Sequence, residues 1–360
     1  MPPVYHFQNG LRFVAPYYYT YRTTVKGRWF DRSILEVFTE EFRDYDRGHY
    51  IKRIEEDNVQ VIRKRKGKET VYKGKILMDL PLESGDLVIH KEHKHERPVS
   101  DTKIKIVHND QNILVVDKPS GIPMHPVQGY LYNTLTEILK KDLSLKRLHP
   151  CNRLDKLTSG VVLLCKNVQS ASFYQQMIQN RNFTKEYVAR VDGKFPTIPC
   201  ECSDDVVVID AKRKSHGFCR REALTRFKLL KYSPILNQSI VLCKPVTGRT
   251  HQIRIHLRNL GHAIVNDPLY NPKLNNLLGN AKKIDLTTRE GQEVVQNEHT
   301  QKRIDLLSGQ KCPECGIDLY KEPDSKSLIM YLHALRYSSK NEQGELQCYE
   351  TEMPQWTYIT

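Results

Sequence analysis

Apolar runs bounded by turn residues recur along the chain from residue 104 onward. Short runs of this kind, rich in β-branched residues, predict buried strands. The predicted strands are Ile104–Val107, Ile113–Val116, Val161–Cys165, Glu186–Val191, Ala223–Phe227 and Ser239–Cys243. Apolar positions at helical spacing predict helices at Ser170–Asn180 and Thr250–Asn259, the second ended by Gly261. Because strands outnumber helices and do not alternate strictly with them, the pattern predicts an α+β fold with a mixed, largely antiparallel sheet.

A second group of predicted elements precedes this region. A Ser-x-x-Glu capping-box pattern begins at Ser33 and leads into apolar residues at helical spacing, and another short helical pattern covers Tyr50–Glu56. Strand-like pieces at Val59–Ile62 and Ile76–Met78 then flank a basic run. Two helices followed by a hairpin with a basic tip predict a small α+β module over residues 31–92, a size that is only marginally stable alone.

The remaining segments are assigned by their composition. Residues 1–30 are aromatic and basic and predict an N-terminal arm, and residues 93–103, where His, Lys, Glu and Pro cluster, predict a linker. Residues 104–360 make up the larger predicted domain, with a polar and charged insertion near 276–310.

The net charge of +14, with a pI near 9.2, indicates the kind of partner. A basic surface concentrates polyanions, and nucleic acid is the usual partner. The basic run of the small module, Arg63, Lys64, Arg65 and Lys66, is suited to phosphates without reading base sequence. The alternatives are a generally basic solvated surface, a solvated hairpin turn, or attraction to anionic lipid. No apolar run approaches the length that crosses a bilayer, so no membrane partner is expected.

The cysteines and the N-terminus indicate the compartment. The nine cysteines are scattered without a dense framework, and no secretory signal is visible, so a reducing compartment is expected. We expect the cytoplasm or the nucleus. The mitochondrion is the alternative, because the first thirty residues are basic before the first acid, Asp31, as in an organelle transit peptide.

One carboxylate stands out among the polar turns. Asp155 lies between Arg153 and Lys156, immediately before the apolar run Val161–Cys165. That position places it at the mouth of a predicted sheet, where functional residues concentrate on loops held by a rigid scaffold. Without further evidence, Asp155 would be expected to cap a turn or to form a surface ion pair.

Two further segments change that interpretation. Thr184–Ala189 is a strand that presents Tyr187 beside basic residues, and Thr247–His256 is a turn that opens a helix carrying Arg254. With the Arg-Leu-Asp turn at Asp155 and a Lys-Pro-Ser-Gly turn, they resemble the motifs of the RluA-type pseudouridine synthases, from about residue 104 to 337. The resemblance extends to Asp267-Pro268-Leu269-Tyr270 and Leu332-His333-Ala334.

The resemblance implies a chemistry and a catalytic site. The family isomerises uridine to pseudouridine in RNA, breaking a carbon–nitrogen glycosidic bond and forming a carbon–carbon bond, with no cofactor and no metal. Asp155 matches the catalytic carboxylate, which acts as a nucleophile or a base. Arg254 matches its ion-pair partner, and Tyr187 matches the ring that stacks on the target base. Whether Asp155 attacks the base ring, attacks the sugar or removes a sugar proton is left open.

The resemblance also implies which residues touch RNA. The target base must leave its stack to reach Asp155, and Arg153 is then expected to fill the gap it leaves. His149 and Asn152 are expected to shape the same loop. Arg221 and Arg249 are further candidates for RNA binding.

The N-terminal part resembles the eukaryotic branch that modifies tRNA in the anticodon loop at position thirty-two. We therefore expect a tRNA substrate, with the same reaction on ribosomal or another RNA as an alternative. The small module resembles the αL-type RNA-binding domain of many relatives. No obligate protein partner is implied, and a monomer is expected. The rival from another class is a catalytically silent RNA-binding or RNA-folding protein on the same scaffold.

A pair of cysteines raises a metal question. Cys312-Pro-Glu-Cys315 is half of a structural zinc site, and among the cysteines only Cys348, Cys200 and Cys202 remain to complete it. We expect free thiols and no metal. A zinc-dependent base deaminase is disfavoured because Cys312-Pro-Glu-Cys315 lacks the Pro that directly precedes the cysteine motif of such enzymes.

Overall fold

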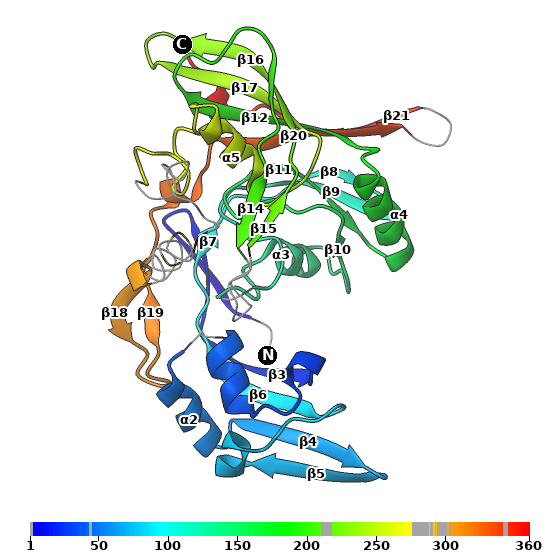
Figure 1. Cartoon of the computed structure of the whole chain (residues 1–360), viewed down its shortest axis with the longest axis vertical. Coiled ribbons are helices and arrows are strands. Elements are labelled where there is room, and N and C mark those ends of the chain that lie inside the picture. Colours follow the sequence, from blue (N-terminus) through cyan, green and yellow to red (C-terminus); the bar gives the residue numbers. More distant parts are fainter. Residues whose placement is uncertain are drawn as a thin grey trace. The chain divides into compact units, whose positions relative to one another are not determined.

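A computed structural model describes residues 3–42, 45–127, 129–209, 218–275, 288, 291, 293, 301, 304–340 and 345–360. The chain divides into two compact units, which are described separately below (Figure 1). The smaller unit comprises Met1–Val4, Ala15–Glu96 and Lys311–Ile317, and the larger unit comprises Tyr5–Val14, Arg97–Gln310 and Asp318–Thr360.

The smaller unit is built on a four-stranded antiparallel sheet. Its strand order is β3 (Tyr17–Thr24), β6 (Leu87–Lys94), β4 (Val59–Arg65) and β5 (Lys68–Lys73). The helical segments are the 3₁₀ turn Gly27–Trp29, α1 (Ile34–Val37), the π-helical turn Phe38–Phe42, α2 (Arg47–Glu55) and the 3₁₀ turn Gly74–Met78. The capping box at Ser33 is confirmed, because the Ser33 side chain accepts from the backbone of Glu36 while the Glu36 side chain accepts from the backbone of Ser33. The apolar core of this unit includes Trp29, Val37, Ile54, Val61 and Leu77.

Two expectations for this part of the chain change. Ile76–Met78 was expected to be a strand but lies in the 3₁₀ turn that begins at Gly74, whose φ of +67° suits a residue without a side chain. The partner of β4 is instead β5. The two units also divide the chain differently from the ranges expected from composition, since β3 lies within 1–30 and the end of β6 lies within 93–103.

The larger unit contains the main sheet (Figure 1). Its strands follow the order β13 (Cys200–Cys202), β16 (Thr225–Ser233), β17 (Gln238–Pro245), β12 (Thr184–Asp192), β20 (Leu332–Lys340), β11 (Ser159–Cys165), β9 (Ile113–Lys118) and β8 (Lys105–Asn109), with β10 (His149–Pro150) beside β11 and β21 (Leu346–Glu350) beside β20. Among the described strand pairs of this sheet, only β11 and β20 run parallel. The expected α+β class with a mixed, largely antiparallel sheet is therefore confirmed.

All six strands predicted from residue 104 onward are present in this sheet, with ends shifted by a few residues. Both predicted helices are also present, as α4 (Val168–Gln179) and α5 (Gln252–Asn259), and Gly261 follows α5 with a φ of +83°. The pattern missed α3 (Leu135–Asp142) and the central strand β20. Much of the expected insertion near 276–310 lies outside the described residues.

Three smaller sheets complete the described structure. They are β1 (Tyr5–Gln8) with β2 (Leu11–Val14) and β7 (Val99–Ser100), the pair β14 (Val206–Ile209) and β15 (Phe218–Arg221), and the hairpin β18 (Leu307–Lys311) and β19 (Asp318–Tyr320).

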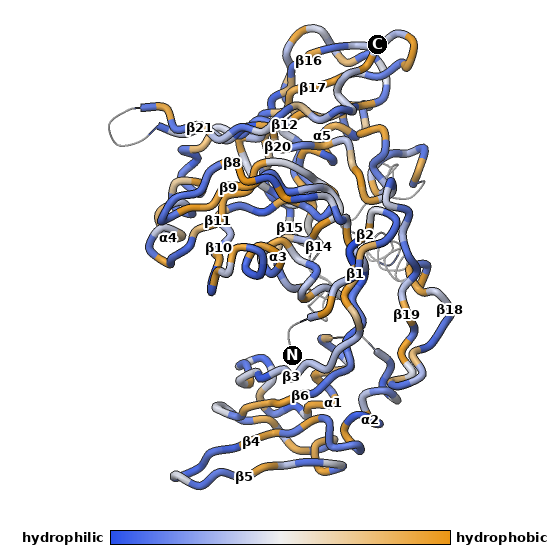
Figure 2. Tube along the Cα trace, turned by 180° about the vertical axis from the view of Figure 1, so that it is seen from behind, coloured by the Kyte–Doolittle hydropathy of each residue, from blue (hydrophilic) through white to orange (hydrophobic). Residues whose placement is uncertain are grey.

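The core of the larger unit lies along the middle of its sheet. Hydrophobic residues run along β9 (Figure 2), and Ile113–Val116 and Val161–Cys165 are fully buried. Fully buried runs of this length are expected for strands covered on both faces. None of the helices in the described part of the chain combines the length and apolar character needed to span a bilayer.

Candidate active site

Asp155 lies in the turn between β10 and β11, where the sequence predicted it. The backbone N–H of Thr158 donates to the Asp155 carbonyl at 3.1 Å, which closes the turn. The buried Asn152 side chain joins the turn to the backbone of β11. Its Oδ1 accepts from the Leu163 N–H at 2.8 Å, and its Nδ2 donates to the Val161 carbonyl at 3.3 Å. The Asp155 side chain remains 30% exposed, so it stays accessible to a substrate.

Gly160 brings β11 close to β20 at the base of this turn. Its φ is +111°, and a Cβ atom added there would lie 2.2 Å from the Ala334 carbonyl oxygen and 2.6 Å from the Ala334 nitrogen. Only glycine tolerates both the backbone conformation and the close approach. Gly160 pairs directly with Ala334, so this contact sets the register between the turn that carries Asp155 and the centre of the sheet.

Arg254 links Asp155 to a second carboxylate. Its Nη1 lies 3.2 Å from Asp155 Oδ2, while Nε and Nη2 donate to the two oxygens of Asp267 at 2.7 and 2.8 Å. The bidentate pair with Asp267 is the shorter contact, and both of its side chains are almost completely buried. Arg254 therefore presents its remaining N–H edge to Asp155 from a fixed position.

The Arg254–Asp267 pair stays ionised despite its burial. Burial alone would raise the pKa of Asp267, but the hydrogen bonds from Arg254 and from the Leu269 and Tyr270 N–H groups lower it below its ordinary value. Burial likewise opposes the charge of Arg254, yet Asp267 and Asp155 raise the pKa of Arg254. The cation that faces Asp155 is thus permanent at physiological pH.

The segment before α5 places the residues around Arg254. His251 has a left-handed backbone, with φ +57°, and precedes the first turn of the helix. Gln252 is buried and ties this turn to β16: its Nε2 donates to Thr225 Oγ1 at 2.9 Å, and its Oε1 accepts from the Arg249 N–H at 2.9 Å. These contacts account for Gln252 within the Gly-Arg-Thr-His-Gln-Ile-Arg sequence.

His251 and Tyr270, which were not among the predicted site residues, also border the carboxylate. His251 Nε2 lies 3.5 Å from Asp155 Oδ2, and its Nδ1 lies 2.9 Å from the Tyr270 hydroxyl. The Arg254 guanidinium lies 5.0 Å from the centre of the Tyr270 ring. Both residues, like Asp267, fall within the motifs that carried the family resemblance, and that is the signal that identifies them.

Tyr187 lies on β12, two strands away from β11 in the sheet. The register between β12 and β20 shifts between Glu186 and Tyr187, and such an irregularity re-aims a side chain. The Tyr187 hydroxyl is hydrogen-bonded to that of Tyr337 on β20, which also accepts from Asn152 Nδ2 at 3.3 Å. Burial, with the hydroxyl of Tyr337 and the charge of Asp155, raises the pKa of Tyr187 well above 10. Tyr187 is therefore a neutral phenol beside the carboxylate.

Lys118 anchors the turn of Asp155 to the end of β9. It is fully buried, and its ammonium donates to the carbonyls of Pro119, Ile122 and Lys156 at 2.9, 2.9 and 3.1 Å. Burial lowers the pKa of Lys118 to about 7, although Asp155 opposes this shift. The bond to the Lys156 carbonyl fixes the backbone next to Asp155.

The other expected RNA-facing residues of this unit differ in exposure. Arg153 is exposed, and its side chain has no hydrogen bond or ion pair with any residue the structure describes. His149 is half-buried on β10, and Asn152 is committed to the turn. Arg221 is exposed at the end of β15, and Arg249 donates from Nε to the Glu222 carbonyl at 3.0 Å.

The basic run of the smaller unit divides into two kinds of residue. Lys64, Arg65 and Lys66 are exposed at the β4–β5 hairpin. Arg63 is buried: it donates to both oxygens of Asp86 at 2.9 and 2.7 Å and to Glu83 at 2.7 Å. Asp86 raises the pKa of Arg63 against the effect of burial. We therefore withdraw Arg63 from the expected RNA contacts, because its guanidinium holds the β4–β5 hairpin to the turn that precedes β6.

The site combines an accessible carboxylate, a buried permanent cation and a neutral phenol. A carboxylate held this way can attack a carbon centre or accept a proton. The described residues within reach of Asp155 do not form a set of metal ligands; among the described residues, such a grouping occurs only in the smaller unit.

Comparison with known proteins places this site in context. Residues 112–259 match the family described as RNA pseudouridylate synthase. The chain is 37% identical over 96% of its length to the "tRNA pseudouridine(32) synthase, mitochondrial" of Saccharomyces cerevisiae, of which it covers 77%. It is 35% identical over 98% of its length to the tRNA pseudouridine(31) synthase of the same yeast, of which it covers 96%. It is also 40% identical over 74% of its length to human pseudouridylate synthase RPUSD2, of which it spans about half, 47%. The residues matched by the family include Asp155, Tyr187 and Arg254.

Proposed function

This chain belongs to the RNA pseudouridylate synthases of the RluA type, and on that premise we propose that it isomerises uridine thirty-two of the tRNA anticodon loop with Asp155 as its catalytic carboxylate. The enzyme class is an isomerase acting on RNA. In the reaction the bond between C1′ and N1 breaks and a bond between C1′ and C5 forms. The C5 proton is lost to base or solvent and N1 gains one, so the product has the composition of the substrate.

The observation that carries the catalytic proposal is the ion pair between Arg254 and Asp155. The 3.2 Å contact comes from a guanidinium already fixed by Asp267, so it orients Asp155 without closing access to it. In our proposal Asp155 acts as the nucleophile or the base, and Arg254 holds its side chain in position. Tyr187 supports the target base by stacking, a contact worth about 1–3 kcal/mol per base.

The roles of the surrounding residues follow from their exposure. Arg153 is exposed beside Asp155, so we propose that it enters the RNA stack when the target base leaves. His149 and Asn152 shape the turn. Arg221 and Arg249 are proposed as contacts to phosphates.

We propose tRNA as the substrate on two grounds. The yeast relatives that cover most of the chain are named for tRNA positions 32 and 31, and the net charge of +14 favours a polyanionic partner. Their identities of 37% and 35% do not separate the two positions, so position thirty-one is the runner-up, followed by the same reaction on another RNA. In the smaller unit, Lys64, Arg65 and Lys66 are proposed to bind RNA backbone.

The assembly state and compartment are also proposals. We propose a monomer without an obligate protein partner, which light scattering of the purified chain will test. We propose the cytoplasm or nucleus. The name of the mitochondrial yeast relative supports the mitochondrion as the alternative, and fractionation of cells expressing a tagged chain separates the two.

The decisive experiment maps pseudouridine in RNA at single-nucleotide resolution. Cells that lack the protein are complemented with the wild type, with Asp155→Asn, or with Asp142→Asn, a control carboxylate exposed at the end of α3. We expect pseudouridine at tRNA position thirty-two with the wild type and the control, and none with Asp155→Asn, whose tRNA affinity is retained. Modification at position thirty-one, or in another RNA only, would overturn the substrate assignment but not the reaction. Full activity of Asp155→Asn would overturn the catalytic assignment.

The same experiment tests the rival function. A catalytically silent RNA-binding protein would leave all pseudouridine positions unchanged while still binding tRNA. Tyr187 and Arg254 lie around the accessible carboxylate of Asp155. This arrangement favours the enzyme, because RNA binding alone does not require it.

A further inference from the structure

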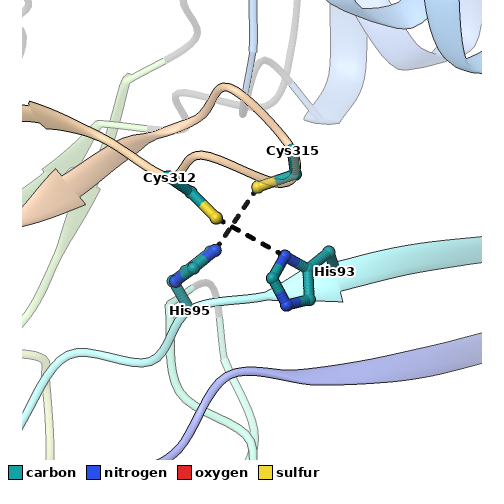
Figure 3. Close-up of side chains that lie close together, drawn as sticks. All are labelled: His93, His95, Cys312 and Cys315. Carbon is teal, nitrogen blue, oxygen red and sulfur yellow. Dashed lines mark hydrogen bonds between the residues drawn. The ribbon is translucent and has the colours of Figure 1, made fainter.

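Four residues of the smaller unit bring two imidazoles and two thiols together (Figure 3). His93 lies near the end of β6 and His95 follows that strand, so the two side chains lie on the same side of an extended chain. Cys312 and Cys315 lie in the tip of the hairpin between β18 and β19. One nitrogen or sulfur atom from each of the four residues lies within 4.8 Å of all the others.

The distances match those between ligands of one metal ion. Cys312 Sγ lies 3.8 Å from His93 Nδ1, and Cys315 Sγ lies 3.3 Å from His95 Nε2. In tetrahedral zinc sites the Zn–N bonds are about 2.0–2.1 Å and the Zn–S bonds about 2.3 Å, which sets nitrogen and sulfur about 3.5 Å apart. His93 and Cys312 are buried, so the four groups meet at a protected point rather than on an open surface.

A chain of polar contacts orients one of the histidines. His93 directs Nδ1 toward the thiols, and its other nitrogen, Nε2, lies 3.4 Å from Glu314 Oε2. The Tyr18 hydroxyl donates to the second oxygen of Glu314 at 2.6 Å. Metal-binding histidines usually donate their second ring nitrogen to a carboxylate, which fixes the tautomer and the ring orientation. Glu314 supplies that carboxylate from within the same turn.

The turn itself is folded to direct both thiols inward. Cys312 N donates to the Ile317 carbonyl at 2.8 Å, and Gly316 N donates to the Cys312 carbonyl at 2.9 Å. Gly316 has φ +71°, and a Cβ atom there would meet nothing within 4 Å, so its glycine is needed for the backbone conformation and not for space. The turn is thus compact and preformed around its two cysteines.

We propose that His93, His95, Cys312 and Cys315 bind one zinc ion in a tetrahedral structural site. Two thiolates and two imidazoles are a donor set that zinc prefers, and four protein ligands leave no open position for catalysis. The ion joins strand β6 to a hairpin tip about 219 positions later in the chain. The proposal is independent of the reaction at Asp155.

From the sequence, only other cysteines were expected as partners for this pair. Cys348, Cys200 and Cys202 do not belong to the grouping of ligand atoms that the described residues form. The sequence signal was the pattern His93-x-His95, which lay in the segment assigned as a linker.

Metal analysis of the purified full chain tests the proposal. We expect one zinc per chain after exhaustive dialysis, and we expect Co²⁺ in its place to give the visible bands of a tetrahedral ion with a thiolate charge-transfer band. Cys312→Ser and Cys315→Ser should each lower the bound zinc severalfold. Cys348→Ser, which changes an exposed cysteine outside the group, should retain it.

A second variant keeps the test valid if the serine variants fold poorly. His95→Cys preserves four ligands, so it should retain zinc and strengthen the charge-transfer band of the Co²⁺ form. Substoichiometric zinc in the wild type, zinc unchanged by Cys312→Ser and Cys315→Ser, or a Co²⁺ spectrum unaffected by His95→Cys would each overturn the proposal.

Discussion

Asp267→Asn removes the charge that holds Arg254 in place while keeping the shape of the side chain. In the wild type, Arg254 donates to both oxygens of Asp267, and Asp267 also accepts from the backbone of Leu269 and Tyr270. The amide retains one acceptor oxygen but turns an NH₂ group toward a guanidinium N–H. Arg254 is then left with the longer contact to Asp155 as its only carboxylate partner among the described residues.

The expected loss of stability follows from burial. Breaking a buried ion pair by removing one partner costs about 3–5 kcal/mol. Because Asp155 still faces Arg254, we expect the lower end, about 3 kcal/mol. In catalysis, Arg254 would no longer be fixed when it contacts Asp155, and we expect kcat to fall at least about tenfold, which corresponds to roughly 1.4 kcal/mol.

Urea unfolding and single-turnover kinetics on tRNA, measured where the variant is still folded, separate the two effects. Glu201→Gln is the matched control, since Glu201 forms an exposed ion pair with Arg226 at 3.4 Å and its loss should cost less than about 1 kcal/mol. Asp267 has a lowered folded-state pKa, so its contribution is fully present above the unfolded pKa of 3.8 and is lost as the pH falls through the lower folded value. The deficit of Asp267→Asn should therefore be constant near neutral pH and shrink only below about pH 4. If Asp267→Asn matches Glu201→Gln in both stability and kcat, the buried pair does not hold Arg254.

Three further predictions concern the sheet and the RNA contacts. Gly160→Ala should destabilise the larger unit by about 2–5 kcal/mol in thermal unfolding, because the new Cβ meets the backbone of β20 and the φ is unfavourable; an unchanged melting curve would contradict this. Tyr187→Phe keeps the ring and should lose only about 1 kcal/mol of stability with the hydroxyl, whereas Tyr187→Leu should lower kcat/KM by a further amount worth about 1–3 kcal/mol of stacking; equal kinetics for the two would exclude stacking. Lys64→Ala with Lys66→Ala should weaken tRNA binding and reduce its salt dependence by up to about two phosphate contacts, and an unaltered salt slope in a binding titration would remove the hairpin from the RNA interface.

Six strands of the larger unit could be predicted from sequence because each contains a local run of apolar residues that packs within the main sheet. The run Ile113–Val116 is fully buried and needed no distant information. Strand β20 could not be found this way. It contains His333, whose ring meets Ser159 Oγ at 2.8 Å and Thr351 Oγ1 at 2.6 Å, and burial lowers its pKa to about 4. A buried polar residue satisfied by partners far along the chain leaves no local apolar pattern.

In the candidate site, too, local motifs could be recognised from the sequence, whereas contacts between distant residues could not. The ordered motifs located Asp155, Tyr187 and Arg254, but not that Arg254 is held mainly by Asp267, because a bidentate pair is a matter of geometry. The basic run was treated as one charged surface, although Arg63 alternates with Val59 and Val61 on the inward face of β4. Side chains alternate between the two faces of a strand. Continuing that alternation from Val59 and Val61 to the end of β4 would have assigned Arg63 to the inward face, apart from its exposed neighbours.

The place of β20 has a consequence for how the protein is made. This strand lies between β11 and β12, yet its residues follow both in the chain by well over a hundred positions. As the chain leaves the ribosome, the two halves of the main sheet must wait, with their inner edges unpaired, until β20 emerges and joins them. Unpaired edges of this kind invite association between chains. A premature stop before residue 332 would therefore remove the middle of the sheet and not its margin, and such nascent products should depend heavily on chaperones or be degraded.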